Sequence, residues 1–254
     1  MSDEVLVERR DQILIVTINR PEARNAVNRA VAEGVAAAMD ELDSDRELTL
    51  GVITGAGGSF CSGMDLKAFL TGERPSIKGR GFAGLTEAPP SKPLIAAVEG
   101  YALAGGCEVV LACDLVVAAE SAKFGIPEAK RGLVAAAGGL LRLPHRVPPQ
   151  IAMELALTGD FLSAPDAHRH GLVNRLTQTG GALDGALGLA AKISANGPLA
   201  VRASKQVIVE SADWSSAEMW ERQSKIIESI FTSADAREGA QAFAEKRPPV
   251  WRGE

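Results

Sequence analysis

Two short segments of the sequence end in a carboxylate, in a pattern suited to proton transfer beside a carbonyl group. Gly105-Gly106-Cys107-Glu108 and Phe124-Gly125-Ile126-Pro127-Glu128 each follow an apolar run. The first segment predicts a turn that opens a helix, so free backbone N–H groups and the positive end of the helix dipole would face an anion. Such donors can hold an enolate-like oxygen while Glu108 and Glu128 add or remove protons.

Each part of this pattern also has a structural interpretation. Gly105-Gly106 could be a tight strand-to-helix turn that needs backbone freedom. Glu108 would lie in the first helical turn, where a carboxylate can cap a helix in any protein. Glu128 could form a surface ion pair with Lys130 or Arg131. The stretch between the two glutamates is long enough for a helix, a strand and a turn, which would return both to the same end of a sheet.

Other catalytic chemistries lack the residues that they need. Cys61 has no histidine near it in sequence, and no Gly-x-Ser-x-Gly elbow is present, which argues against a covalent nucleophile. No Walker loop or dinucleotide fingerprint occurs. His168 and His170 have no third ligand nearby, so we expect them to be solvated. We therefore expect no metal and no redox cofactor.

The composition indicates a globular protein with a sizeable core. The chain has 254 residues, of which 46% are hydrophobic and 23% charged, and its formal net charge is -5. Scattered basic residues, with only Arg202 and Lys205 in the stretch 200–210, and few aromatic residues argue against nucleic-acid binding. The odd number of cysteines, the acidic first residues and the absence of a long apolar run lead us to expect a cytoplasmic protein that does not bind membranes.

The elements that would position these segments alternate between strands and helices. We expect strands at 5–8, 13–19, 48–54, 93–98, 115–118 and 122–125. Helices are expected after Asn28, which would act as an N-cap, and over 105–113. This order predicts an α/β fold with crossover connections and mostly parallel strands. Segment 71–91, rich in glycine, proline, serine and charge, predicts a mobile loop over a site.

Helices dominate the second half of the chain. We expect them at 139–146, 149–158, 163–170 and 182–195, with a short strand at 172–176. Asn196-Gly197 would separate a catalytic core, 1–195, from a C-terminal helical region, 196–254. That region would contain one long helical stretch from Pro198 to about 233 and a last helix at 235–246. Its large apolar side chains either pack on the core or form an interface between copies: Trp214, Trp220, Ile226, Ile227, Ile230 and Phe231.

The order of six motifs resembles that of the crotonase (enoyl-CoA hydratase/isomerase) superfamily, and the resemblance covers nearly the whole chain. The motifs occupy 19–26, 60–66, 92–101, 105–108, 124–128 and 243–247. The resemblance implies a spiral of ββα units and a C-terminal helical region that builds trimers, often paired into hexamers. It also implies an acyl-CoA thioester as the substrate.

The resemblance implies a role for each matching residue. The thioester oxygen would accept hydrogen bonds from the N–H groups of Met64 and Gly105. CoA would run along Ala23, Arg24 and Ala26, with its adenine near Ser62, Asp65 and Leu66. Lys246 would meet the CoA phosphates, in some members from a neighbouring subunit. Further substrate contacts are expected from Ala104, Pro127 and Ala136.

A glutamate at both catalytic positions is typical of the family's hydratases, whereas mitochondrial-type isomerases usually keep only the second. The resemblance therefore implies reversible hydration of a trans-2-enoyl-CoA to a 3-hydroxyacyl-CoA, in fatty-acid or related acyl-CoA degradation. Glu108 would position and deprotonate water for attack at C3, and Glu128 would protonate C2. Coenzyme A enters as part of the substrate, so no further cofactor is implied.

Four departures from the family pattern leave alternatives open. Met64 replaces a common alanine, Ala104 and Ala136 replace glycines, and 132–139 replaces a loop that usually contains Pro-Gly. A methyl group at Ala136 would crowd the water. The alternatives are another family lyase or isomerase, such as a carnitinyl-CoA-type dehydratase or a 3,2-enoyl-CoA isomerase, and a catalytically silent acyl-CoA-binding protein.

Overall fold

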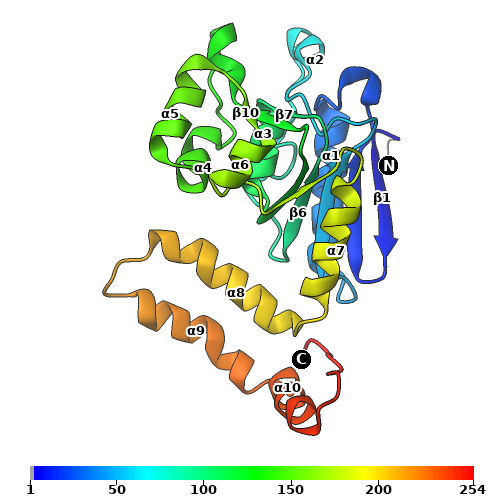
Figure 1. The fold of residues 1–254 in the computed structure, drawn as a ribbon, viewed down its shortest axis with the longest axis vertical. Helices are drawn as coiled ribbons and strands as arrows, with labels where there is room; N and C mark the ends of the chain where they lie inside the picture. Colours follow the sequence, from blue (N-terminus) through cyan, green and yellow to red (C-terminus); the bar gives the residue numbers. More distant parts are fainter. Residues whose placement is uncertain (1–2) are drawn as a thin grey trace.

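A six-stranded, mostly parallel sheet forms the centre of the computed structural model, which describes residues 3–254 (Figure 1). Its strand order is β1-β2-β3-β6-β8-β11, and only β1 is antiparallel to its neighbour. The strands are β1 Val5–Arg10, β2 Ile13–Ile18, β3 Leu50–Gly55, β6 Leu94–Val98, β8 Leu115–Ala119 and β11 Arg175–Thr177. The predicted parallel α/β pattern is confirmed, although the strand expected at 172–176 begins only at Arg175.

A second, three-stranded sheet lies beyond the carboxyl ends of the central strands. It contains β7 Tyr101–Leu103, β9 Lys123–Gly125 and β10 Leu162–Ser163, and Cys61 forms an isolated bridge to Ala102. Three units therefore share one plan: a central strand, a short pairing in this small sheet, and then a helix. The helices are α2 Leu66–Leu70, α3 Gly105–Ala112 and the 3-10 helix η2 Pro127–Arg131. Chain segments that follow three central strands consequently meet at one edge.

Helices cover both faces of the central sheet. Asn28 caps α1 Arg29–Ser44, as predicted, by accepting a 2.9 Å hydrogen bond from the N–H of Val31. Small residues of α7 Ala182–Ser194 pack on the opposite face, where Ala182, Ala186 and Ala190 meet Ile15 and other strand residues. The remaining core helices are α4 Gly139–Arg146, α5 Pro149–Thr158 and α6 Ala164–Arg169. The bounds of α4 and α5 match the predicted ones.

Segment 71–91 is not the loop that the sequence predicts. It contains paired strands β4 Ser76–Ile77 and β5 Gly81–Phe82, followed by a buried turn. Residues 81–86 are all buried, with Leu85 fully enclosed. Gly84 passes so close to the carbonyl of Ala32 in α1 that a Cβ would overlap it. The prediction of a mobile loop is therefore wrong for 81–86, which form a fixed wall.

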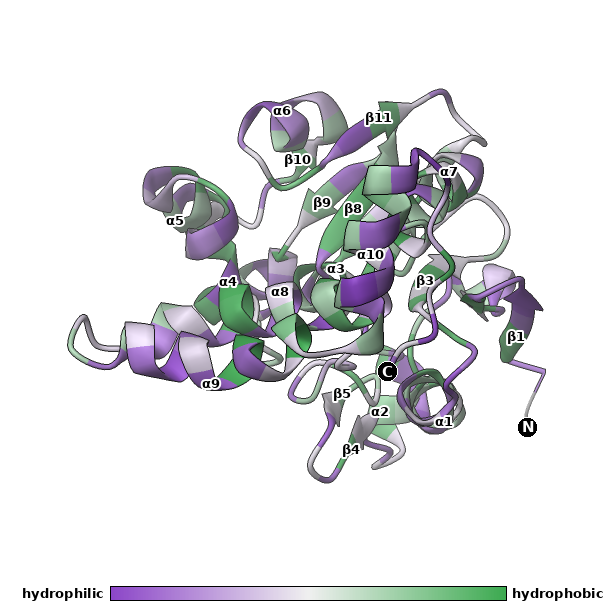
Figure 2. Ribbon diagram, turned by 90° about the horizontal axis from the view of Figure 1, so that it is seen from below, coloured by the Kyte–Doolittle hydropathy of each residue, from purple (hydrophilic) through white to green (hydrophobic). Residues whose placement is uncertain are grey.

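The single long helical stretch predicted from Pro198 to 233 is also wrong. The chain forms α8 Pro198–Glu210, a 3-10 turn η3 Ser211–Asp213, α9 Met219–Phe231 and then α10 Ala234–Glu245. The backbone of Trp214 is extended, which ends the helical path and reverses its direction. In Figure 1 the helices α8 to α10 lie apart from the sheet, and α9 lies beside α8 in both views (Figures 1 and 2).

One ion pair fastens the C-terminal helices to the core. The Nζ of Lys205 in α8 lies 2.7 Å from a carboxylate oxygen of Asp114 and also donates to the carbonyls of Pro90 and Lys92. The buried residues of the larger hydrophobic core cluster end at Val173 and those of the other at Ala190 in α7. The division of the chain at residue 195 stays a prediction. Within residues 3–254, no helix has the length and apolar character needed to cross a membrane.

Candidate active site

A cavity of about 830 Å³ opens where the chain segments after the central strands converge. Five separate stretches line it, at 20–26, 62–69, 76–87, 103–108 and 127–137, together with Phe161. Glu108 from α3 and Glu128 from η2 both lie on its wall. The two carboxylates suspected from the sequence therefore belong to one site.

Glu108 is held by backbone donors on a different segment. Its Oε1 accepts hydrogen bonds of 2.7 Å from the N–H of Ala137 and 2.8 Å from the N–H of Gly139. The side chain is 3% exposed, and burial raises its pKa, although these two N–H groups and the charge of Arg142 oppose the increase. The capping interpretation is wrong, because no side chain caps α3. Instead, the carboxylate is fixed with one oxygen bonded and Oε2 free of any donor among the described residues.

Glu128 is half-buried and has a different environment. Its Oε2 is inaccessible to solvent and has no hydrogen-bond partner within residues 3–254. Burial, with a further contribution from the charge of Glu108, raises its pKa to about 7. The surface ion pair with Lys130 is not formed, because Lys130 lies 2.7 Å from Asp160 instead. A carboxyl group with this pKa can be protonated near neutral pH, which suits a general acid.

Two backbone N–H groups in the cavity wall are free to bind an anion. Val27 bonds to the carbonyl of Gly63 and to the N–H of Asp65, which turns the N–H of Met64 to the other side of that strand-like segment. Gly105 is the first residue of α3, so its N–H has no acceptor within the helix. No hydrogen bond of the described residues uses either N–H. Both residues line the cavity that contains the glutamates.

The paired glycines are needed for close packing, not for backbone freedom. A Cβ at Gly105 would fall on the ring of Phe82, and one at Gly106 would overlap the carbonyl of Cys61. The residue with the unusual backbone is Ala104, at φ 51° and ψ -130°. That region is strained for any residue with a side chain. The structure therefore corrects the turn interpretation and moves the strained position to Ala104.

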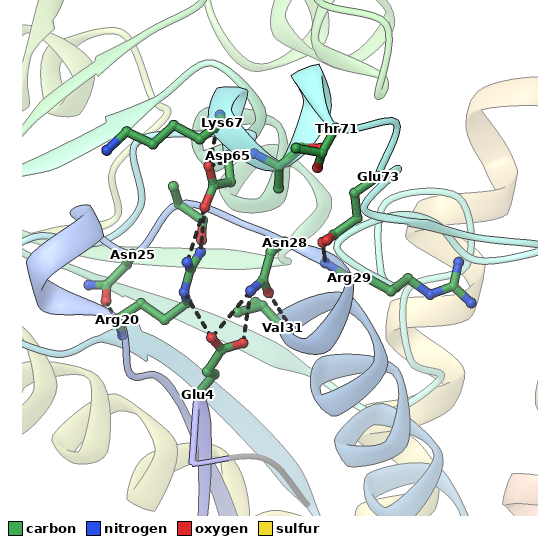
Figure 3. Close-up of polar contacts among 12 residues, drawn as sticks. Glu4, Arg20, Asn25, Asn28, Arg29, Val31, Asp65, Lys67, Thr71 and Glu73 are labelled. Carbon is green, nitrogen blue, oxygen red and sulfur yellow. Dashed lines mark hydrogen bonds and ion pairs between the residues drawn. The ribbon is translucent and has the colours of Figure 1, made fainter.

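A polar network joins the two segments expected to bind the CoA portion (Figure 3). Both terminal nitrogens of Arg20 lie 3.0 Å from Oδ2 of Asp65, and one also donates to the carbonyl of Ala26. The Nε of Arg20 lies 3.2 Å from Glu4. Although burial opposes ionisation of Asp65, the N–H of Ala68 and the guanidinium of Arg20 hold its pKa below the usual range. Asp65 therefore acts as a tether and as the N-cap of α2.

Cys61 and His168, which the sequence analysis also considered, have no part in the proton-transfer chemistry. Cys61 is fully buried, and burial raises the pKa of its thiol to about 12, so it is unsuited to act as a nucleophile. His168 is exposed, and its Nδ1 lies 2.8 Å from the carbonyl of Val173. Throughout 3–254, no three His, Cys, Asp or Glu side chains are grouped as metal ligands would be. The expectation that no cofactor is needed stays a prediction.

Comparison with known proteins identifies the group to which this geometry belongs. A family model described as enoyl-CoA hydratase/isomerase matches residues 8–254. The chain belongs to the enoyl-CoA hydratase/isomerase family. It is therefore an enzyme of the crotonase superfamily, and the expected α/β spiral of ββα units is confirmed.

Named relatives of this family member fall into two groups. The chain is 45% identical to the enoyl-CoA hydratase EchA19 of Mycobacterium tuberculosis, covering 97% of this chain and 95% of that protein. It is 42% identical to the carnitinyl-CoA dehydratase of Salmonella enteritidis, with both chains covered completely. A crystal structure of the enoyl-CoA hydratase EchA1 from Mycobacterium marinum has a TM-score of 0.98 and 64% sequence identity, again with complete coverage of both.

The structure brings together nearly all the positions that the family motifs predicted. Those on the cavity wall are Ala23, Arg24, Ala26, Ser62, Met64, Asp65, Leu66, Ala104, Gly105, Glu108, Pro127, Glu128 and Ala136. Lys246 is not among them. It is exposed and ends α10 in a left-handed conformation. A contact between Lys246 and CoA therefore stays a prediction. In the form that remains relevant, Lys246 would come from a neighbouring subunit.

Sequence reasoning missed several residues that shape the site. Phe82 packs on Gly105, and the guanidinium of Arg142 lies over Gly138, between the two donors to Glu108. Asn25, fully buried, donates to the carbonyls of Ala56 and Ser59 and so closes the turn at the CoA end. Only Asn25 lay in a quoted motif. The other two act across long sequence separations, for which the sequence carries no local signal.

Proposed function

We propose that this enzyme adds water reversibly across the 2,3 double bond of a trans-2-enoyl-CoA to give a 3-hydroxyacyl-CoA. One observation carries the proposal: Glu108, Glu128 and the two unused N–H groups of Met64 and Gly105 line the same cavity. A hydration needs a base for water, an acid for carbon and a site for negative charge. This cavity has candidates for all three.

The first step would use the free oxygen of Glu108. That oxygen removes a proton from water, and the water oxygen forms a bond to C3 of the substrate. The electron pair of the double bond then moves toward the thioester, whose oxygen becomes an enolate. The N–H groups of Met64 and Gly105 would bind this oxygen, and a single donor of this kind is typically worth about 3–4 kcal/mol in the transition state.

The second step would use the proton of Glu128. The enolate collapses, its electron pair forms a C–H bond at C2 with that proton, and Glu128 becomes a carboxylate. The pKa of about 7 allows Glu128 to carry the proton at the start of the reaction near neutral pH. Dehydration is the same sequence in reverse, with Glu128 removing the proton from C2.

The CoA portion would lie at the charged end of the cavity. Ala23, Arg24 and Ala26 would follow its chain, and Ser62, Asp65 and Leu66 would surround the adenine. Since the carboxylate of Asp65 is bonded to Arg20 and to the N–H groups at the start of α2, its contribution would be to fix the wall rather than to bind adenine directly. Arg24 and Lys67 line the same end and could meet phosphates.

Loss of enoyl-thioester ultraviolet absorbance tests the reaction. Wild type would be assayed with trans-2-enoyl-CoAs of increasing chain length, beside Glu108→Ala and Glu128→Gln. We expect rapid loss with wild type and rates reduced by about 10²–10⁴-fold in each variant, the usual range for a general acid or base. A Glu128→Gln variant as fast as wild type on every chain length would contradict the proposal.

A dehydratase acting on one particular acyl group is the second candidate. The 42% identity to a carnitinyl-CoA dehydratase over complete chains favours it, and the same residues serve both directions. Mass spectrometry of a panel of 3-enoyl and hydroxyacyl thioesters separates this candidate and a 3,2-isomerase from the hydratase. Tight binding of CoA thioesters with no turnover of any would instead support a silent binding protein.

We also propose that the C-terminal helical region, 196–254, joins copies of the chain as a trimer or a dimer of trimers. No residue of α9 is buried, and Trp220 and Phe231 are 68% and 77% exposed. Such apolar surface is costly on a monomer, and packing on the chain's own core is not how these side chains lie. Three unpaired, buried cysteines, Cys61, Cys107 and Cys113, favour a cytoplasmic location.

A further inference from the structure

Ala104 keeps a strained backbone conformation in the cavity wall, and the reaction steps above assign it no role. Its φ of 51° and ψ of -130° lie in a region that glycine occupies far more readily than alanine. Ala104 directly precedes Gly105, whose N–H is one of the two proposed oxyanion donors. Strain of this kind persists where surrounding contacts fix it, and it concentrates at functional sites. The contacts of Ala104 therefore need an explanation.

Hydrogen bonds on both sides of Ala104 fix its backbone. Its N–H donates a 2.9 Å hydrogen bond to the carbonyl of Gly125 in β9, and its carbonyl accepts a 3.1 Å hydrogen bond from the N–H of Glu108 in α3. The preceding residue, Leu103, donates to the carbonyl of Cys61. Rotation of the Ala104 backbone into a relaxed region would break at least one of these bonds.

The methyl group of Ala104 lies between the two segments that carry the donors. A Cβ at Gly63 would lie 2.8 Å from the Cβ of Ala104 and 3.1 Å from the backbone nitrogen of Gly105. That is too close for two methyl groups, so the Cα of Gly63 rests against the methyl of Ala104. The residue after Gly63 is Met64, which supplies the second proposed donor. Ala104 is thus in contact with the segment of one donor and adjacent in sequence to the other.

Different parts of the chain hold the two donors. Gly105 packs on the ring of Phe82. Met64 forms an isolated bridge with Val27, which lies on the opposite side of the segment 62–65 from the free N–H. The contact made by the Ala104 methyl is the one that lies beside both donors. Its size therefore influences how far apart the two N–H groups stand.

Oxyanion donors act only when they are well placed. Each should lie about 2.7–3.1 Å from the position that the oxyanion will occupy. A displacement of about 0.5 Å is enough to impair a site of this kind. Without the methyl group, the two segments could approach each other or fluctuate. The loss would be greater for the enolate than for the uncharged thioester, since the oxygen carries more negative charge in the transition state.

We propose that the methyl group of Ala104 is the spacer that sets the separation of the Met64 and Gly105 N–H groups. Ala104 is then a positioning residue, which acts on the enolate through the two donors. The inference rests on the proposed function, in which those N–H groups bind the thioester oxygen. It also accounts for the strain, because the site needs a Cβ at a position where glycine would have the lower backbone energy.

The test compares Ala104→Gly, which removes the Cβ, with Ala104→Ser, which keeps it. The probe is hexanoyl-CoA with an isotope label in its thioester carbonyl, because a saturated acyl group cannot be hydrated. Infrared difference spectroscopy of the bound probe reports the hydrogen bonding of the carbonyl oxygen, and calorimetry gives the Kd. Steady-state assays with the matching trans-2-enoyl-CoA give kcat and KM separately.

We expect wild type to lower the carbonyl stretching frequency of the bound probe, and Ala104→Gly to lose much of that shift. The kcat of Ala104→Gly should fall about tenfold, since complete removal of one oxyanion donor costs about 10²–10³-fold. The Kd of hexanoyl-CoA should hardly change. Ala104→Ser should retain most of the shift and of kcat. Ala191→Gly, at an exposed position of α7, should leave both unchanged.

Stability separates this role from a merely structural one. Ala104→Gly relieves backbone strain, so its lower kcat should accompany a protein that is more stable than wild type. A residue that only supports the fold would lose stability and activity together.

Two results would overturn the inference. The first is an Ala104→Gly protein with the kcat and the carbonyl shift of wild type. The second is an equal loss in Ala104→Ser and Ala104→Gly, which would mean that the Cβ contact does not position the donors. A carbonyl shift that depends on the Cβ of Ala104, found together with no hydration of any enoyl-CoA, would retain the inference and reject the hydratase.

Discussion

The N–H of Gly139 donates a 2.8 Å hydrogen bond to Oε1 of Glu108, across a gap of one helix, two strands and a turn in the sequence. Ala137 donates to the same oxygen. The proposed base is thus positioned by the loop 135–139 and not by its own helix. Because Oε1 is occupied, Oε2 is the oxygen available to water in the proposed reaction, and the geometry of this loop would decide where that water lies.

Substituting Gly139 by alanine should therefore disable the base while keeping the fold. A Cβ there would lie 3.0 Å from Oε1 and 3.1 Å from Cγ of Glu108, closer than ordinary contact. We expect kcat to fall at least tenfold, since a displaced catalytic group costs that much or more. Stopped-flow or steady-state absorbance assays measure the effect.

Gly188→Ala in α7 is the matched control for this substitution. A Cβ at Gly188 meets nothing within 4 Å, so alanine should leave the rate unchanged and raise helix stability slightly. Equal rates for Gly139→Ala and Gly188→Ala would refute the positioning of Glu108 by this loop.

Arg142→Gln should shift the pH profile as well as lower the rate. The guanidinium donates to Thr86, lies over Gly138, and its charge lowers the pKa of Glu108. Without that charge the pKa of Glu108 rises, so the acid limb of kcat/KM for hydration moves to higher pH. Arg146→Gln is the control on the same helix, because Arg146 donates to Cys113 instead and should leave that limb in place.

Hydration should weaken as the pH rises through about 7. The proposed acid, Glu128, must be protonated at the start of hydration, and burial raises its pKa to about 7. Dehydration needs the same single proton on the pair of glutamates, placed on Glu108 at the start, and the overall equilibrium releases no proton, so kcat/KM for dehydration should fall over the same pH interval. Measurement of kcat/KM in both directions between pH 5 and 9 tests this assignment, and a hydration rate that does not fall above pH 7 would argue against it.

The raised pKa of Glu128 should also make the stability of the protein depend on pH. The folded chain binds the Glu128 proton more tightly than the unfolded chain, so the contribution to stability is present at low pH and lost as the pH rises from about 4.5 to about 7. Glu128→Gln has no such proton. The stability of wild type relative to Glu128→Gln should therefore decrease across that interval, as thermal unfolding at several pH values would reveal.

The sequence predicted the parts of the fold that local patterns encode. The N-cap at Asn28, the buried strands and the bounds of α4 and α5 agree with the structure because each depends on neighbours along the chain. The short strands β7 and β10 could not be predicted in this way. They contain two or three residues and exist because a second sheet accepts them.

The site, like the fold, could be predicted only where local sequence patterns encode it. The motifs located about half of the cavity wall, because four of them follow a central strand and those strands end at one edge. The hydrogen bond from Gly139 to Glu108, the packing of Phe82 on Gly105 and the hydrogen bond from Arg142 to Thr86 all arise from tertiary contacts. Segment 71–91 illustrates the point: its polar composition predicts a loop, yet 81–86 are buried against α1 and α4.

Ala104→Gly should stabilise the protein. At φ 51° and ψ -130°, Ala104 has a backbone conformation that costs roughly 1–3 kcal/mol for a residue with a Cβ. Glycine removes that strain but gains freedom in the unfolded chain, so we expect a net gain of about 1 kcal/mol in the free energy of unfolding. Chemical denaturation measures it, with the exposed helical Ala191→Gly in α7, expected to lose about 1 kcal/mol, as the control. An Ala104→Gly protein less stable than wild type would show that the backbone conformation of Ala104 does not carry this free-energy cost.

Charge placed on α9 should separate the copies of the chain. α9 contacts α8 and part of α10 but buries none of its own residues, and the exposed Trp220 and Phe231 have no cover within the described chain. If a second copy covers them, Trp220→Glu and Phe231→Glu each place an unpaired charge in an apolar interface, which typically costs several kcal/mol. We expect light scattering to report a trimer or hexamer for wild type and a shift toward monomer for each variant. Glu221→Gln, a change at an exposed ion pair on the same helix, should leave the mass unchanged. A monomeric wild type at micromolar concentration would contradict the assembly, and would also remove any route by which Lys246 reaches the cavity of a neighbour.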